Sequence, residues 1–121
     1  MDKQEMDRAL AEVMGWELRL VSNCFNTYFS NRECWCSGTE VLYACEDWHP
    51  TSDWNQMMQV VKKIMENGWY LLLTIGQNIT IANFQRVHVD KGLIGDERAE
   101  TKDPLLAIGE AVLRAAGKWG E

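Results

Sequence analysis

The chain has 121 residues, of which 46% are hydrophobic and 25% charged, a size and balance typical of one globular domain. Eighteen acidic and twelve basic residues give a net charge of -6, and this diffuse acidic balance disfavours DNA or RNA as a partner. The sequence contains no apolar run of about 18 residues and begins without a secretion-signal pattern. We therefore expect no membrane partner and a location in the cytoplasm.

Patterns in the first half of the chain predict one helix and two strands. Residues 2–13 repeat apolar side chains at helical spacing, and Asp2 is placed to cap the first turn. Residues 16–21 alternate as a strand does, and residues 39–45 predict a second strand. Between them, residues 22–38 are rich in Asn, Ser and aromatic residues, which predicts an irregular segment that is either packed as a lid or exposed for a partner.

The middle of the chain predicts a helix and a hairpin. The run His49-Pro50-Thr51-Ser52-Asp53 predicts a helix start with Thr51 or Ser52 as its cap, and the helix then runs to Glu66. Residues 69–75 are almost continuously apolar, which predicts a central strand buried on both faces. A short turn then joins this strand to residues 79–89, which predicts an antiparallel hairpin.

A charged loop and a final helix are predicted at the end of the chain. Residues 95–103 are expected to be the loop, and Asp103-Pro104 is a strong helix start because a capping residue precedes a proline. Gly117 is expected to close this helix. The whole chain, residues 1–121, is therefore predicted to be one α+β domain in the order α-β-β-α-β-β-α.

Several short segments resemble the phage ABA sandwich domain, a family of small phage and prophage proteins. They are Val13-Met14-Gly15-Trp16, His49-Pro50-Thr51-Ser52-Asp53, residues 65–70, residues 103–108 and residues 113–117. The resemblance implies a three-layer helix-sheet-helix sandwich on an antiparallel sheet of about four strands. It also implies a phage or prophage origin, and so a host cytoplasm. It brings no known activity, and residues 22–38 match the family pattern least well.

No motif marks the chain as an enzyme. It has neither a glycine-rich phosphate loop nor a Gly-x-Ser-x-Gly turn, and its two histidines, His49 and His88, form no metal-binding pair in the sequence. We therefore expect no catalytic residue, no cofactor and no metal. An uncharacterised hydrolase is the less favoured alternative.

Four cysteines, Cys24, Cys34, Cys36 and Cys45, are grouped in the first half of the chain. Four thiolates can bind zinc, but only Trp35 separates Cys34 from Cys36, whereas zinc sites favour two or more intervening residues. Reduced thiols that pack as small apolar side chains are the favoured interpretation in a cytoplasmic protein.

The strand predicted at residues 79–89 carries the candidate binding site. Strand alternation puts Phe84, Arg86 and His88 on one face, where an aromatic ring, a guanidinium and an imidazole can contact a nucleotide-like ligand. Trp35 is a further candidate to stack on a base. The alternative is an ordinary strand end whose polar side faces water.

These features favour a non-enzymatic phage or prophage accessory protein that binds a host molecule. By analogy with other small phage proteins, the first hypothesis is a counter-defence sponge that sequesters a nucleotide-derived immune signal. The alternative is a protein-interaction module that inhibits a host protein through the aromatic residues 22–38. In either case we expect a homo-oligomer, most simply a symmetric dimer.

Overall fold

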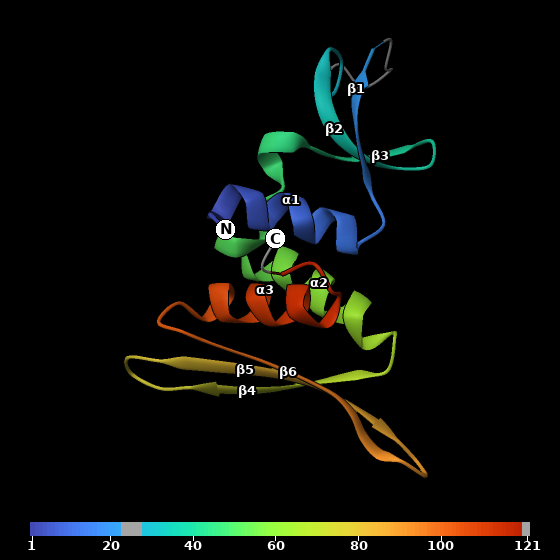
Figure 1. The fold of residues 1–121 in the computed structure, drawn as a ribbon. Helices are drawn as coiled ribbons and strands as arrows, with labels where there is room; N and C mark the ends of the chain where they lie inside the picture. Colours follow the sequence, from blue (N-terminus) through green and yellow to red (C-terminus); the bar gives the residue numbers. More distant parts are fainter. Residues whose placement is uncertain (23–27, 120–121) are drawn as a thin grey trace.

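The structure is a computed structural model that describes residues 1–22 and 28–119, and it has an α+β fold with two sheets (Figure 1). Its elements, in chain order, are α1 (Lys3–Val13), β1 (Glu17–Val21), β2 (Arg32–Ser37), β3 (Glu40–Ala44), the 3-10 turns Cys45–Asp47 and Pro50–Ser52, α2 (Trp54–Met65), β4 (Trp69–Ile75), β5 (Thr80–His88), β6 (Gly92–Thr101) and α3 (Pro104–Ala115). Strands β1-β2-β3 form one antiparallel sheet and β4-β5-β6 form another. The α+β class is confirmed, whereas the single four-stranded sheet and the predicted element order are wrong.

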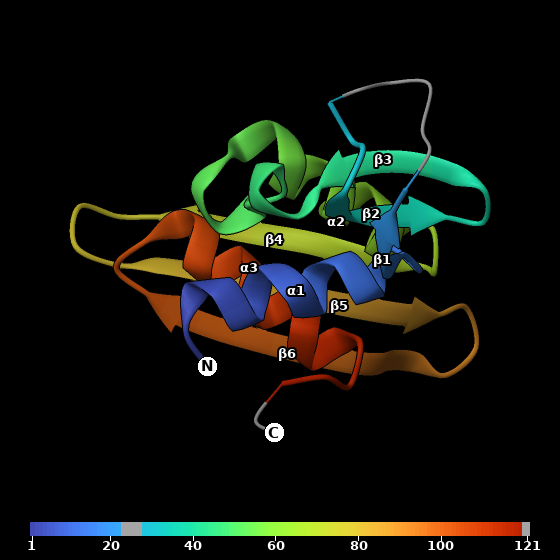
Figure 2. The same cartoon turned by 90° about the horizontal axis from the view of Figure 1, so that it is seen from above.

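The layers also differ from the expected helix-sheet-helix sandwich. Helices α2 and α3 lie on one face of the β4–β6 sheet, α1 packs against them from the other side, and the small β1–β3 sheet lies beyond α1 (Figures 1 and 2). Among the described residues, no helix covers the second face of the β4–β6 sheet. The order of layers is therefore sheet, paired helices, single helix and small sheet.

In the described part of the chain, each of the helices α1, α2 and α3 begins at an aspartate that accepts a backbone hydrogen bond. Asp2 accepts from the amide of Glu5 at 2.8 Å, and Asp103 accepts from the amide of Leu105 at 3.0 Å, as the sequence predicted. At α2 the cap is Asp53, which accepts from the amide of Gln56 at 3.1 Å. Thr51 and Ser52, the predicted caps, belong instead to a separate 3-10 turn.

The main core lies where the three helices meet the β4–β6 sheet. Its largest fully buried side chains are Phe84, Leu10, Met57, Ile108 and Leu113. The helices approach closely at Gly109 of α3, since a Cβ added there would lie 3.0 Å from the Met6 methyl and 3.3 Å from the Met57 methyl. Glycine at this position therefore sets the spacing of α1, α2 and α3.

Three predicted segments have a different structure from the one expected. Strand β4 is an edge strand with an exposed side, although its apolar run suggested burial on both faces. The expected charged loop 95–103 is mostly strand β6, because charges at every second position are compatible with a sheet face that is open to water. The expected irregular segment 22–38 contains strand β2, and its residues 23–27 lie outside the described part of the chain.

The small sheet has a minor apolar cluster of its own. Strand β2 is its middle strand, and Cys34 and Cys36 pack on one side with Ala44 while Trp35 points to the main core. Both sides of β2 are therefore buried, which removes the alternation by which a strand is recognised in sequence.

Candidate functional site

The site predicted on β5 does not have an accessible aromatic ring. Phe84 is 0% exposed because its side of the strand faces α3, so the ring predicted to stack on a ligand is not accessible in this structure. Arg86 is exposed on the same side, and its guanidinium lies 5.9 Å from the centre of the Trp69 ring. The ring nitrogen Nδ1 of His88 accepts from the amides of Asp90 and Lys91 at 3.1 and 3.2 Å. His88 therefore shapes the β5–β6 turn.

The fourth predicted residue, Trp35, lies in the other sheet. The helical layers separate β2 from β5, so the structure does not bring Trp35 near Arg86 (Figure 1). The ligand site proposed from the sequence is thus not assembled as one surface, and Trp35 instead lines a separate cavity. That cavity replaces β5 as the candidate site.

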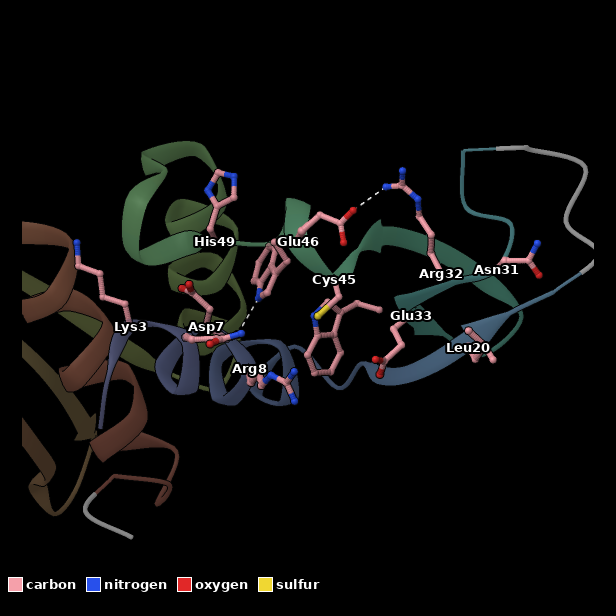
Figure 3. A pocket seen from close by; sticks show the side chains of 13 residues that line it. Lys3, Asp7, Arg8, Leu20, Asn31, Arg32, Glu33, Cys45, Glu46 and His49 are labelled. Carbon is pink, nitrogen blue, oxygen red and sulfur yellow. Dashed lines mark hydrogen bonds and ion pairs between the residues drawn. The ribbon is translucent and has the colours of Figure 1, made fainter.

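This cavity lies between α1, the small sheet and the segment that follows β3 (Figure 3). It has a volume of about 740 Å³. Its lining comes from four stretches that are separated in sequence. They are Lys3, Gln4, Asp7 and Arg8 of α1; Leu20 of β1; Asn31, Arg32, Glu33 and Trp35 in and just before β2; and Cys45, Glu46, Trp48 and His49. We call it the α1 pocket.

Two tryptophans form the apolar wall of the α1 pocket. Trp35 and Trp48 are 4% and 3% exposed, so only a small part of each ring is open to the cavity. The indole N–H of Trp48 donates to the backbone carbonyl of Asp7 at 2.9 Å, and its ring meets that of Trp16 edge-on with centres 4.7 Å apart. The wall is therefore fixed by packing and by a hydrogen bond to α1.

The cations around the pocket differ in how they are paired. Arg32 forms an ion pair with Glu46 at 2.6 Å, and its guanidinium lies 4.6 Å from the centre of the Tyr28 ring. Lys3 lies 3.9 Å from a carboxylate oxygen of Asp103. Arg8 extends along α1 toward β2 in Figure 3, and it has no ion-pair or hydrogen-bond partner among the described residues. Arg8 is thus the cation most available to an incoming anion.

Asp7 connects α1 to the segment after β3. Its carboxylate accepts from the backbone amide of Thr51 at 2.9 Å. Burial raises the pKa of Asp7 above its usual value of 3.8, while the hydrogen bond from Thr51 and the nearby charges of His49 and Lys3 oppose that rise. The Asp7 carboxylate therefore holds the segment after β3 against α1, although partial burial disfavours its charged form.

The cysteines are distributed between the pocket and the minor cluster. Cys34 and Cys36 are buried, and Cys45 is partly exposed at the pocket. In the described part of the chain, no three His, Cys, Asp or Glu residues are grouped so that they could hold a metal ion. Cys24 lies outside the described residues.

The aromatic segment suggested as a protein-binding loop is largely packed down where it is described. Trp35 is buried, Phe29 packs against the minor apolar cluster, and Tyr28 donates a hydrogen bond to Asp47. These contacts make the segment a support for the α1 pocket more than a free loop.

Comparisons of the chain with family models, curated proteins and solved structures found no match. No helix among residues 1–22 and 28–119 has the length and apolar character needed to cross a membrane.

Sequence reasoning missed most of the pocket. Arg8 lies on the polar face of a helix and Arg32 in a segment predicted to be irregular, so neither has a spacing that indicates a shared site. One sequence feature could have indicated the pocket, namely Trp48, an aromatic residue that lies between predicted elements and beside a histidine.

Proposed function

We propose that the protein is a non-enzymatic binding protein that holds a small anionic ligand in the α1 pocket. The observation that carries the proposal is Arg8, an exposed guanidinium without a partner among the described residues, at a cavity of about 740 Å³ with an apolar tryptophan wall. Pockets for small molecules commonly measure about 300–1,000 Å³ and combine an apolar lining with few polar groups.

The chemistry of the lining favours a ligand with both an anionic group and an apolar ring. Arg8 supplies a planar fork suited to phosphate, and Arg32 can contribute a second cation although Glu46 already neutralises part of its charge. The exposed parts of Trp35 and Trp48 offer apolar contact to a ring. A nucleotide-derived immune signal has both features, and the resemblance to phage domains favours a counter-defence sponge that sequesters such a signal.

Calorimetric titration with AMP, ADP-ribose and a cyclic dinucleotide tests the proposal. We expect at least one of them to bind, and we expect Arg8→Ala to weaken binding by about 1.5–3 kcal/mol, the range for a hydrogen bond to a charged group. Arg114→Ala is the matched control, because Arg114 lies on α3 and does not line the pocket. Equal affinities of Arg8→Ala and the wild type would exclude the α1 pocket.

Analysis of the bound ligand separates binding from catalysis. After incubation, the protein is denatured by heat and the released ligand is analysed by mass spectrometry. Recovery of the intact ligand is the result expected of a sponge. Release of an altered ligand would identify an enzyme instead, and failure of every nucleotide to bind would reject this ligand class.

A further inference from the structure

The β4–β6 sheet has one face that no described helix covers (Figure 1). Large apolar side chains are exposed on this face. Tyr70 and Leu72 of β4 are 61% and 54% exposed, and the neighbouring strands add the exposed pair Val87 and Leu93. Large apolar side chains exposed together on one sheet face are typical of a contact with another macromolecule.

On this open face, side chains along one strand form a column, and side chains paired across the three strands form a row. Two adjacent rows, each read from β4 through β5 to β6, are Tyr70, Gln85 and Asp96, and then Leu72, Asn83 and Arg98. Side chains two residues apart share a face, so both rows belong to the open side. The β4 column is therefore apolar, the β5 column carries amides, and the β6 column carries charges of alternating sign.

We propose that the open face binds a second copy of this chain through a two-fold axis that crosses the strands between these two rows. The axis places Tyr70 of each copy over Leu72 of the other and Gln85 over Asn83. It also places Asp96 of each copy opposite Arg98 of the other, so the ion pair forms twice in the symmetric contact. The proposal is independent of the ligand assigned to the α1 pocket.

Charge selects this axis from the other two-fold arrangements. An axis parallel to the strands would cover the charged β6 column with the apolar β4 column and would leave buried charges unpaired. An axis through the row of Leu72 would place Asp96 opposite Glu100 of the second copy, two like charges. An axis between the row of Tyr70 and the row of Leu72 instead pairs Asp96 with Arg98 and places the apolar side chains of β4 over one another.

The intramolecular partner of Arg98 is compatible with this contact. Arg98 forms an ion pair with Glu100 of the same strand, and both side chains remain about half exposed. Glu100 can therefore hold the Arg98 guanidinium in place. The remaining N–H groups of Arg98 can reach Asp96 of the second copy, since sheets pack face to face about 10 Å apart.

Sedimentation and light scattering on the full chain test the interface. The wild type is expected to have the mass of two chains at micromolar concentration, and Leu72→Asp the mass of one. Asp96→Arg and Arg98→Asp are each expected to raise the dimer dissociation constant about tenfold or more, because each places like charges opposite one another. Glu40→Arg, an equivalent charge reversal in the small sheet, should leave the dimer unchanged.

Mixing the two charge-reversed chains gives the sharpest result. The Asp96→Arg chain carries arginine at positions 96 and 98, and the Arg98→Asp chain carries aspartate at both. An equimolar mixture is therefore expected to form a heterodimer with near-wild-type affinity. Circular dichroism checks that each variant is folded. A wild type that stays a single chain, single reversals that dimerise normally, or a mixture no tighter than its components would each overturn the proposal.

Discussion

The two sheets of this protein differ in how they are joined to the core. Strand β5 contributes Thr80, Ala82 and Phe84 to the main core, all at 1% exposure or less. The small sheet gives Trp35 to that core, while Cys34 and Cys36 pack into a separate cluster. The β4–β6 sheet therefore belongs to the main core. The small sheet, which lines one side of the α1 pocket, contributes fewer fully buried side chains to that core.

This difference links stability to function. Regions with few buried contacts open at a lower free energy than the core, and ligand-binding segments are commonly found among them. We therefore expect the β1–β3 sheet to respond to mutation and to ligand more locally than the β4–β6 sheet does.

The largest expected effect is that of Phe84→Ala. Removing this fully buried ring should lower the free energy of unfolding by about 3–5 kcal/mol, as measured by urea denaturation. Phe29→Ala is the matched change in the minor cluster, where the ring is only partly buried, and it should cost less than half as much. Equal losses from the two changes would show that the sheets contribute equally.

Asp7→Ala is expected to have the next largest effect. It leaves the Thr51 amide without its acceptor, and we expect a loss of about 1–3 kcal/mol in the free energy of unfolding. Asp7→Asn keeps an oxygen acceptor and removes the partly buried charge, so at pH 7 it should be as stable as the wild type or more stable. A destabilised Asp7→Asn variant would contradict the description of Asp7 as a partly buried acceptor for the Thr51 amide.

The raised pKa of Asp7 predicts that the free energy of unfolding depends on pH. Because the pKa of Asp7 is raised in the fold, its contribution to stability is fully present below its unfolded value of 3.8 and is lost as pH rises through the higher folded pKa. Comparing the stability of the wild type with that of Asp7→Asn from pH 3 to pH 7 isolates this step. The wild type should lose stability relative to the variant as the pH rises.

Helix caps give the smallest effects and serve as a reference for the others. Asp53→Ala and Asp103→Ala each remove one side-chain acceptor at a helix start, and each should cost about 1 kcal/mol in thermal or urea unfolding. Asp53 follows the segment that lines the α1 pocket, so a much larger loss there would indicate that the wall and α2 unfold together.

The sequence was most informative where a local rule decides the structure. Asp2 and Asp103 cap their helices as predicted, and the β4–β5 hairpin forms as expected, since a cap or a short turn depends on adjacent residues. Strand β6 was missed because its alternating charges face an open side. Strand β2 was missed because burial of Cys34, Trp35 and Cys36 on both sides hides its period.

The candidate site was harder to predict than the fold. Phe84 and Arg86 share a strand face in both the prediction and the structure, but α3 covers the part that holds Phe84. The α1 pocket collects side chains from four separated segments, and Arg8, Arg32 and Cys45 lie on three of them. Only the packing of α1 against the segment after β3 brings them together, and no residue spacing encodes that contact.

The indole N–H signals of the tryptophans distinguish the α1 pocket from the site predicted on β5. In ¹H–¹⁵N spectra recorded while a binding nucleotide is added, the signals of Trp35 and Trp48 should shift, because both rings line the pocket. The signal of Trp69, which lies beside Arg86, should stay in place. A shift confined to Trp69 would move the binding site back to β5 and would contradict the assignment of the α1 pocket.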